Sequence, residues 1–500
     1  MRRALFALAL ALVFPGLLEA AEPAPVAARP RAREVGIAPG TLAPGPLNAI
    51  TDVAGVRVGH VTLVEGEDVR TGATAILPHS GNVFRQKVPA AVVVGNGFGK
   101  LVGSTQVNEL GQLETPILLT NTLAVSEAAD ALAAYTLALP GNEDVISVNP
   151  LVGETNDGWL NDIRKPSLRR EHFLEALRSA REGPVPEGSV GAGTGTTAFG
   201  GKREIKGGIG TSSRLVPESV GGHAVGVLVQ TNFGGDLVMD GVPAGKELGV
   251  RALAEAAGEG RPPAEYGSCL IVVATDAPLD TNSLRRLGAR ALAGMARTGA
   301  SFSSGSGDYV VAFSTATALR IPHPGLQAPA PVLVPATLSA LFQAVAEATE
   351  EAILNSLLKA TTVRGFRGRE ARTLPLDALE KVFARYGRPF GPRPVPGLRR
   401  PPKRAYCLES SPFLMTRTSD PLASTVPTPT TVILHSLQIE TFVVLPSIEV
   451  EVVAAPSSTL TSYFFESSFL RSTAAAVVAS PRVATARARH ERALTMASCS

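Results

Sequence analysis

Short apolar runs separated by glycine-rich turns recur through the middle of the chain, which is typical of β-strands in a folded core. Helical periods lie between some of them, with apolar residues on one face of each predicted helix. The predicted strands cover 48–60, 90–94, 144–148, 223–230, 270–274 and 309–314, and the predicted helices cover 126–137, 281–298 and 336–359. Mixed strands and long amphipathic helices predict an α+β domain built in layers.

Both ends of the chain differ from this middle. Residues 1–20 begin with Arg2 and Arg3, continue with an apolar run at 4–18 and end on small residues. This pattern predicts a signal peptide, so we expect the mature protein in the periplasm or outside the cell. The apolar run is too short to span a bilayer comfortably, and we expect no membrane association after its removal.

The composition of residues 21–500 divides them into three segments. Residues 21–45 are rich in Pro, Ala and Arg and predict a flexible lead-in. Residues 46–388 form the predicted folded domain. Residues 389–500 begin Pro- and Arg-rich and become Ser- and Thr-rich, without organised periods, which predicts a tail of low order.

The overall composition excludes several function classes. The chain has 500 residues, of which 45% are hydrophobic, so a large core is available. Its net charge is +3 with acids and bases interspersed, which gives no reason to expect nucleic acid as a partner. The three cysteines show no metal-binding spacing, so we expect no metal, no cofactor and no disulfide in the main domain.

Common catalytic motifs are missing. The glycine-rich stretch 191–196 lacks the G-x-G-x-x-G pattern and no helix follows it, which favours close backbone approach over phosphate binding. No G-x-S-x-G or H-E-x-x-H motif occurs. His60 follows a strand and has no local acid and serine partners, so a structural role is favoured. If the chain is a hydrolase, its base is not expected to be histidine.

Several polar groups lie at the ends of predicted strands and are candidates for chemistry. Ser268 follows Gly267 and opens an apolar strand, Ser306 and Asp308 open another, and Asn232 closes a third. Taken singly, each pattern favours a polar turn or a residue at the mouth of a core strand over a catalytic group. A further polar segment, 153–162, carries Glu154 and Trp159 and has a solvated turn as its alternative.

In their order along the chain, these segments resemble the DmpA-type aminopeptidases, a family that includes L-aminopeptidase/D-esterases and β-peptidyl aminopeptidases. The matching pieces span about residues 35–388, and each is weak alone. They are ITDV and VRVGH at 50–60, ETPI and LTNT at 114–122, ETNDG at 154–158, GTG at 193–195, KGGIG at 206–210, TNFG at 231–234, GS at 267–268 and GSGD at 305–308.

The resemblance implies an α-β-β-α sandwich that cleaves itself between Gly267 and Ser268 into two associated chains. It also implies homo-oligomers, for which we expect a tetramer. By residue, Ser268 matches the nucleophile, Ser306 and Asp308 match the hydroxyl and carboxylate that support it, and Asn232 matches an amide that helps to hold the oxyanion.

Substrate recognition is also carried over by residue. Glu154 matches a carboxylate for the substrate amine, and Trp159 stands where some relatives have a tyrosine. The implied activity is an exported, self-processing serine aminopeptidase acting on short peptides, amino-acid amides or esters. Two other classes stay open: an acyltransferase like the ornithine acetyltransferases, whose nucleophile is threonine, and a non-cleaving binding protein on the same fold.

The chemistry of an N-terminal serine fits a site without histidine. Cleavage would give Ser268 a free α-amine with an ordinary pKa of roughly 7.7–8.0, close to working pH, whereas a lysine at about 10.4 would be mostly protonated. One residue can then supply both nucleophile and base.

Overall fold

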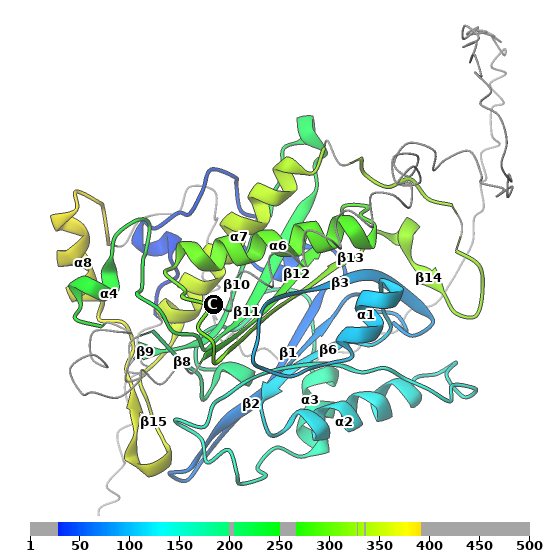
Figure 1. The fold of residues 1–500 in the computed structure, drawn as a ribbon, viewed down its shortest axis with the longest axis horizontal. Helices are drawn as coiled ribbons and strands as arrows, with labels where there is room; N and C mark the ends of the chain where they lie inside the picture. Colours follow the sequence, from blue (N-terminus) through cyan, green and yellow to red (C-terminus); the bar gives the residue numbers. More distant parts are fainter. Residues whose placement is uncertain (1–28, 200–204, 251–266, 328, 335–336, 392–500) are drawn as a thin grey trace, which may run out of the picture. The chain divides into compact units, whose positions relative to one another are not determined.

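The computed structural model describes residues 29–199, 205–250, 267–327, 329–334 and 337–391. Two sheets dominate this part of the chain (Figure 1). The first has the order β1 (Arg57–Glu65), β2 (Val69–Leu77), β6 (Ile117–Asn121), β7 (Leu151–Thr155) and β4 (Leu101–Val102). The second has the order β10 (Gly208–Leu215), β11 (Ala224–Thr231), β12 (Gly267–Thr275), β13 (Ser306–Ser314), β3 (Gln86–Gly97) and β14 (Ile321–Pro322), with β5 (Gln112–Leu113) also paired to β3.

Most neighbouring strands are antiparallel, but β6 with β7 and β12 with β13 are parallel. Two small hairpins complete the strands: β8 (Thr197–Ala198) with β9 (Ile205–Lys206), and β15 (Val363–Arg364) with β16 (Glu370–Ala371). The helices are α1 (Ser104–Leu110), α2 (Val125–Leu137), α3 (Arg170–Arg178), α4 (Ala244–Glu247), α6 (Thr281–Arg297), α7 (Ser339–Lys359) and α8 (Leu376–Arg385).

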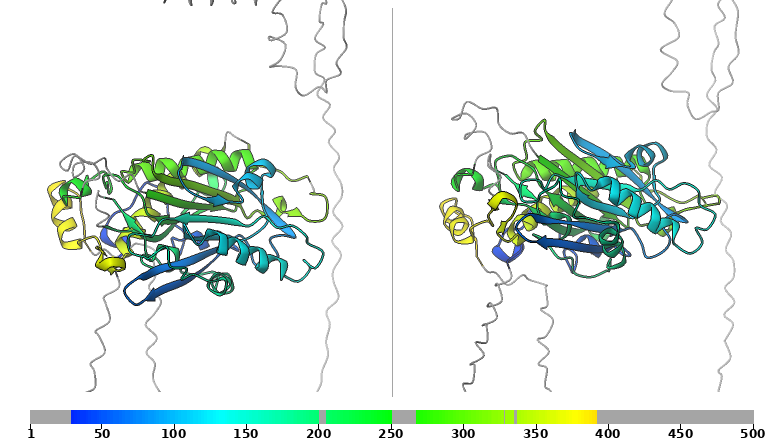
Figure 2. Two further views of the ribbon diagram at one scale, coloured as in Figure 1. Left: turned by 60° about the horizontal axis from the view of Figure 1, so that its bottom comes forward. Right: turned by 90° about the horizontal axis from the view of Figure 1, so that it is seen from below.

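The helices cover the outer faces of the two sheets. Helix α7 packs on β10 and β11, and α6 packs on β3 and β13. Helices α2 and α3 pack on the outer face of the first sheet, and Figure 2 shows the resulting order of helices, sheet, sheet and helices. The four-layer α-β-β-α sandwich expected from the resemblance is therefore confirmed.

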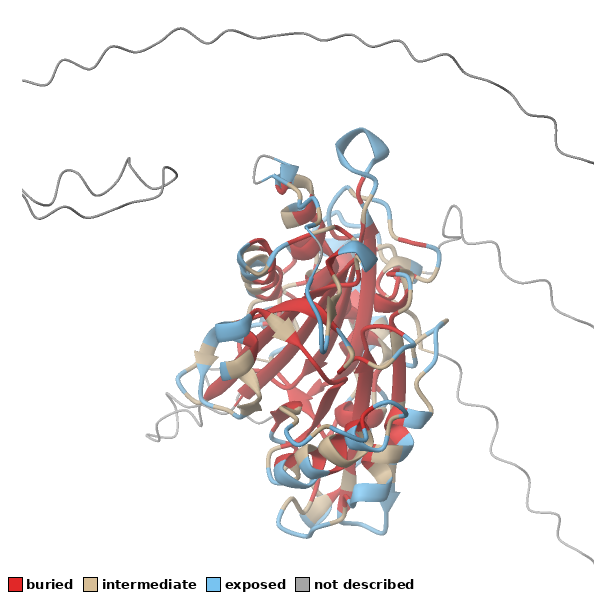
Figure 3. Ribbon diagram, turned by 90° about the vertical axis from the view of Figure 1, so that its right-hand side faces the viewer, coloured by how far each residue is buried: buried red, intermediate tan, exposed pale blue. Residues whose placement is uncertain are grey.

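The central strand β12 is buried on both faces because helices lie on one side and the other sheet on the other (Figure 3). Its odd-numbered residues Cys269, Ile271 and Val273 join the apolar cluster under α6 and α7. Leu270 and Val272 join the cluster between the sheets. A strand buried on both faces has an unbroken apolar sequence rather than an alternating one, which is why 270–274 is uniformly apolar.

Residues 29–45 differ from the predicted flexible lead-in. Val35 and Ile37 are buried in the cluster under α6 and α7. Arg33 forms an ion pair with Glu351 of α7, and the Arg29 side chain donates hydrogen bonds to the carbonyls of Leu358 and Leu374. These arginines, which are part of the composition that predicted flexibility, are instead ion-paired or bonded to carbonyl groups. The remainder of the predicted lead-in, 21–28, the signal peptide 1–20 and the tail from 392 onward lie outside the described residues.

The predicted strand at 144–148 is wrong. Ile146 is 100% exposed, and Asp144 pairs with Arg85 on the surface. The strand of this region is β7, Leu151–Thr155, which includes the start of the segment for which a polar turn was the alternative. Helices α3 and α8 were not predicted, because each has only three buried residues and lies among charged ones.

The predicted strand at 48–60 is wrong in its first half, where Ile50–Asp52 forms a 3₁₀ helix, and right only from Arg57, where β1 begins. The remaining predicted elements are confirmed with shifts of a few residues at their ends. Gly299 has a φ of 90°, and this left-handed residue follows Thr298, the C-cap residue of α6. None of the helices in the described ranges has the length and apolar character needed to cross a membrane.

Candidate active site

Parallel pairing of β12 and β13 brings the two predicted catalytic segments together. Gly267 lies opposite Ser306, Ser268 opposite Gly307 and Cys269 opposite Asp308. Both strands begin here, so the site lies at their N-terminal ends. Asn232 directly follows β11, the antiparallel neighbour of β12, and joins them at the same edge.

Ser268 is 3% exposed, and its hydroxyl donates a short hydrogen bond to the carbonyl oxygen of Gly267, the residue before it. Its main chain is held on the other side, because the Ser268 N–H donates to the Asn232 carbonyl at 2.9 Å and the Asn232 N–H returns a bond at 3.1 Å. The parity of β12 turns the Ser268 side chain toward the space between the sheets, where Leu270 also points.

Gly267 is needed for space. A Cβ added there would lie 3.0 Å from Ser306 Oγ and 3.2 Å from the Phe233 Cα. Its φ is not positive, so close approach, and not a left-handed backbone, favours glycine here.

Ser306 and Asp308 form a buried pair on the helix-covered face of β13. The Ser306 hydroxyl donates to Asp308 Oδ1 at 2.8 Å. Burial raises the pKa of Asp308 to about 6, while the hydrogen bonds from Ser306 and from the Cys269 N–H oppose that rise. Ser306 Oγ lies close to Gly267, on one side of the Gly267–Ser268 peptide bond. The described structure shows no hydrogen bond from Ser306 to Ser268 Oγ.

Asn232 presents an unsatisfied donor. Its Oδ1 accepts a hydrogen bond from the Thr197 N–H at 3.0 Å, which fixes the orientation of the amide. The Nδ2 atom is buried and has no hydrogen-bond partner among the described residues. Leaving a buried donor unpaired costs roughly 1–3 kcal/mol, and such groups are often found where a ligand or transition state completes the bond.

Glu154 lies on β7 and is buried. One carboxylate oxygen accepts the Lys100 N–H at 3.0 Å, and the other accepts a short hydrogen bond from the Thr122 hydroxyl. Burial raises the pKa of Glu154, and these hydrogen bonds and the Lys100 charge oppose the rise. Glu154 also reaches the central strands, because a Cβ at Gly99 would meet its Oε1 at 3.2 Å and the Cα of Gly307 at the same distance.

Trp159 is half-buried and lies under the guanidinium of Arg369, which is 4.4 Å from the centre of the indole. Its Nε1 is buried and has no partner among the described residues. The structure gives no direct contact between Trp159 and Ser268. Trp159 lies in the loop after β7, and its main-chain carbonyl accepts a hydrogen bond at 3.4 Å from Arg369, which lies between β15 and β16.

Two other predictions concern residues outside this cluster. His60 bonds Thr74 Oγ1 through Nδ1 at 2.9 Å, and burial lowers its pKa to about 4, so it remains neutral in a structural position. In the stretch 191–196, a Cβ at Gly193 would lie 2.4 Å from the nitrogen of Ile209. Close backbone approach is therefore confirmed there. Cys269 is a buried free thiol.

Sequence reasoning missed two residues that hold the site together. Gln230 Nε2 donates to Thr155 Oγ1 at 2.8 Å and to the carbonyls of Ala192 and Thr120, so it links the sheet carrying Glu154 to the strand that ends at Asn232. Asn96 Nδ2 bonds the carbonyls of Ser303 and Ser304, which holds the loop before Ser306. The one sequence signal for Gln230 was an amide near the end of an otherwise largely apolar strand.

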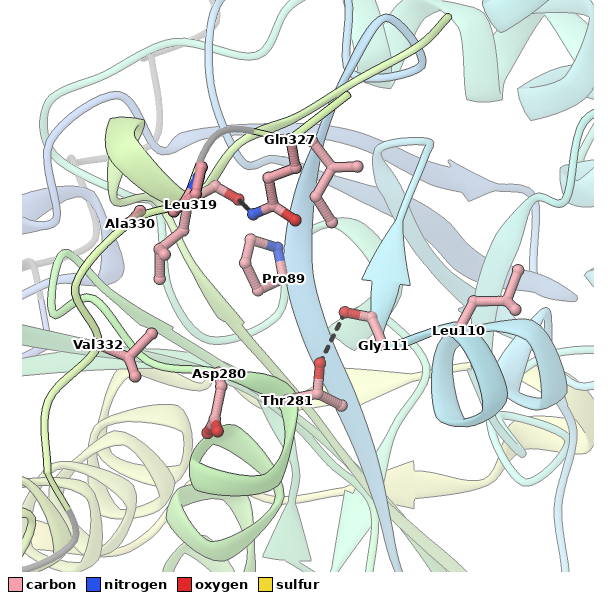
Figure 4. A pocket seen from close by; sticks show the side chains of 11 residues that line it. Pro89, Leu110, Gly111, Asp280, Thr281, Leu319, Gln327, Ala330 and Val332 are labelled. Carbon is pink, nitrogen blue, oxygen red and sulfur yellow. Dashed lines mark hydrogen bonds between the residues drawn. The ribbon is translucent and has the colours of Figure 1, made fainter. Parts of the chain in front are cut away.

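A separate cavity of about 440 Å³ lies elsewhere (Figure 4). Its lining includes Pro89, Asp280, Thr281 and Leu319, which follow the C-terminal ends of β12 and β13 or lie near the start of β3. Strands of nine residues extend for roughly 25–30 Å at about 3.3 Å per residue, so this cavity lies at the opposite end of the central strands from Ser268. Among the described residues, no group of three or more His, Cys, Asp or Glu side chains is placed to hold a metal ion.

Residues 48–371 match the model of a family described as Peptidase family S58. The chain belongs to peptidase family S58. Among curated relatives, it is similar to the beta-peptidyl aminopeptidase BapA of Sphingosinicella microcystinivorans, with 41% identity over 72% of this chain and 93% of that protein. The beta-peptidyl aminopeptidase BapA of Sphingosinicella xenopeptidilytica is 39% identical with the same coverage.

Solved structures of the family agree with this fold. The Burkholderia sp. beta-aminopeptidase has a TM-score of 0.64 and 38% identity, covering 71% of this chain and 99% of that one. The L-aminopeptidase D-Ala-esterase/amidase of Ochrobactrum anthropi has a TM-score of 0.64 and 34% identity over 72% and 99%, and is described as a prototype for the serine aminopeptidases with a variant of the Ntn hydrolase fold. The protein is thus a hydrolase of the aminopeptidase class, as the resemblance implied.

Proposed function

We propose that this member of family S58 cleaves its own chain between Gly267 and Ser268 and then uses Ser268 as an N-terminal nucleophile to remove N-terminal residues from short peptides, amides or esters. The contact between the Ser268 hydroxyl and the carbonyl of the residue before it carries the proposal. Because the strand is buried, this contact holds the Ser268 hydroxyl next to the Gly267–Ser268 peptide bond.

Self-cleavage follows from that contact. Ser268 Oγ attacks the carbonyl carbon of Gly267, its proton passes to the Ser268 nitrogen, and the Gly267–Ser268 C–N bond breaks to leave an ester. Water then hydrolyses the ester, giving a carboxylate at Gly267 and a free α-amine at Ser268. The Asn232 carbonyl, which accepts the Ser268 N–H in the uncut chain, would still orient that amine after cleavage.

In the mature enzyme the α-amine of Ser268 acts as base for its own hydroxyl. The hydroxyl attacks the carbonyl carbon of the substrate's first residue; the bond to the leaving amine or alcohol then breaks as that group takes the proton from the Ser268 ammonium, and water hydrolyses the resulting ester to the free acid. In each addition step, negative charge develops on the carbonyl oxygen. Asn232 Nδ2, a buried donor without a partner among the described residues, supplies a hydrogen bond to that oxygen. Preorganised donors of this kind typically contribute about 10²–10³ in rate.

Substrate selection rests on the free amine. The Glu154 carboxylate, held by the Lys100 N–H and the Thr122 hydroxyl, pairs with the substrate ammonium. This role excludes substrates whose amine is blocked. Two relatives are named beta-peptidyl aminopeptidases, and we include N-terminal β-residues in the proposed substrate range. Trp159 remains part of the proposed substrate-binding surface.

The proposal extends to the state of the protein in the cell. An N-terminal signal peptide would direct the chain to the periplasm or the medium, and the two processed chains would assemble into a homo-oligomer, with a tetramer as the expected size. Sequencing of the mature N-terminus and a mass measurement by light scattering test these two points separately.

Purified wild type, Ser268→Ala and Ser304→Ala provide the main test. Ser304 lies in the loop before β13, and its side chain forms no hydrogen bond among the described residues, so it controls for serine substitution nearby. On a denaturing gel we expect two fragments for wild type and Ser304→Ala, one beginning Ser268-Cys269-Leu270, and a single chain for Ser268→Ala.

Turnover completes the test. Wild type should release free acid from an amino-acid amide and none from its N-acetylated form, and Ser268→Ala should be inactive. An uncut wild type with full activity would exclude Ser268 as an N-terminal nucleophile. Transfer of the acyl group to an added amine, without release of acid, would favour an acyltransferase.

A further inference from the structure

Lys206 is a fully buried lysine that the proposed mechanism does not use. It ends β9, and its Nζ donates hydrogen bonds to two main-chain carbonyls, of Gly193 at 2.7 Å and of Gly207 at 2.9 Å. Burial lowers the pKa of Lys206, and the charge of Asp157 opposes that change. Burying an ammonium is costly unless its bonds are needed, so its position calls for a specific reason.

The two carbonyls belong to two segments, Gly193–Thr197 and Lys206–Gly207, that are hydrogen-bonded to each other. Thr196 Oγ1 donates to the Gly193 carbonyl at 2.9 Å, so this carbonyl accepts hydrogen bonds from both the Thr196 hydroxyl and the Lys206 ammonium. The Gly207 N–H donates to the Thr196 carbonyl at 3.2 Å, and Thr197 pairs with Lys206 in the β8–β9 hairpin. The carbonyl of the Thr196–Thr197 peptide group is therefore held by the Gly207 N–H, and the Thr196 side chain is held by the Gly193 carbonyl. The Lys206 ammonium bonds both of these partner residues, through the carbonyls of Gly193 and Gly207.

That peptide group sets the orientation of Asn232. The Thr197 N–H is the donor to Asn232 Oδ1 at 3.0 Å. Because Oδ1 faces Thr197, the amide nitrogen Nδ2 must face away from it, and this is the buried atom without a partner among the described residues. If the peptide group turned, the amide could rotate and present its oxygen where the proposed mechanism requires a donor.

We propose that Lys206 is a positioning residue, which fixes the Thr196–Thr197 peptide group and thereby keeps the Asn232 amide nitrogen directed at the oxyanion. The proposal rests on the proposed function, since it requires that Asn232 donate in the transition state. Lys206 itself contacts main-chain carbonyls only and has no role as a base.

A double-mutant cycle on the processed enzymes tests this. The variants are Lys206→Met, which keeps an apolar side chain of similar length and removes the donors, Asn232→Ala, and the two combined. Lys206→Met should lower kcat about tenfold, below the loss of about 10²–10³ expected for removing the oxyanion donor itself. KM should change less than twofold, because substrate binding through Glu154 is untouched.

The coupling between the Lys206→Met and Asn232→Ala substitutions distinguishes a positioning role from a general loss of folded structure. If Lys206 acts through Asn232, Lys206→Met should change kcat by less than twofold in the Asn232→Ala background. Equal losses in both backgrounds would overturn the positioning role while leaving the proposed function intact. Normal turnover for Asn232→Ala alone would instead contradict the oxyanion role on which both rest.

Two further variants keep the test decisive. Thr196→Val removes the second donor to the Gly193 carbonyl with little change of shape, and should show the same coupling if Lys206→Met does not fold. Lys87 is another buried lysine, paired with Glu114 at 2.7 Å near the start of β3. Lys87→Met should lower stability and leave kcat unchanged. A loss of kcat for Lys87→Met equal to that for Lys206→Met would attribute the effect to lost stability.

Discussion

Replacing Asp308 by asparagine should stabilise the fold at neutral pH while impairing turnover. The carboxylate is buried, and burial raises its pKa to about 6 from an ordinary value of 3.8. Asparagine can still accept the Ser306 hydroxyl through its oxygen, and its uncharged amide takes the place of Oδ2, which has no partner among the described residues. The substitution therefore removes a buried charge and keeps the main hydrogen bond.

The size of the stability gain and the pH range in which it develops follow from the difference between the folded-state and unfolded-state pKa of Asp308. A folded-state pKa raised above the unfolded value means that the folded protein holds the proton more tightly, so stability falls as pH rises from about 4 to about 6. A difference of about two pKa units corresponds to about 3 kcal/mol. The advantage of asparagine should therefore be small at pH 4, grow to about 3 kcal/mol by pH 7 and stay constant above it.

The measurement is denaturant unfolding from pH 4 to 8, with all variants in a Ser268→Ala background so that the chain stays in one piece. Asp280→Asn is the control, because Asp280 caps α6 and is exposed, and asparagine caps a helix about as well as aspartate. That control should change stability by less than about 0.5 kcal/mol at any pH. No gain for Asp308→Asn at pH 8, or a gain independent of pH, would refute the reasoning.

Three further results are expected. Gly267→Ala should slow self-cleavage with the fold retained, since the new Cβ would lie 3.0 Å from Ser306 Oγ; cleavage at the wild-type rate on a time-resolved gel would contradict this. Glu154→Gln should raise KM for substrates with a free amine at least tenfold while self-cleavage proceeds normally, because cleavage involves no substrate ammonium; initial rates against substrate concentration measure it, and an unchanged KM would remove Glu154 from amine binding. Glu351→Ala should destabilise by about 3–5 kcal/mol, because Glu351 pairs with the fully buried Arg214 at 2.8 Å; a change below about 1 kcal/mol in chemical unfolding would show that the pair is replaceable.

Much of the fold could be predicted because its strongest signals are local. The long helices α6 and α7 and the central strands β11, β12 and β13 have apolar patterns that depend on their own burial. The errors fall where burial depends on distant partners. Ile146 lies in an apolar run that no described residue covers, and Arg33 is held by Glu351 more than three hundred residues away.

The sequence by itself determined the chemical groups of the candidate site: a serine after a glycine, a serine and a carboxylate two residues apart, and an amide at the end of a strand. Only the tertiary structure decided how these groups meet. Parallel pairing of β12 with β13 sets Gly267 against Ser306, and the contact that follows explains the glycine. The orientation of the Asn232 amide depends on Thr197 and, through it, on Lys206, since hydrogen bonds between distant segments leave no periodic signal in the sequence.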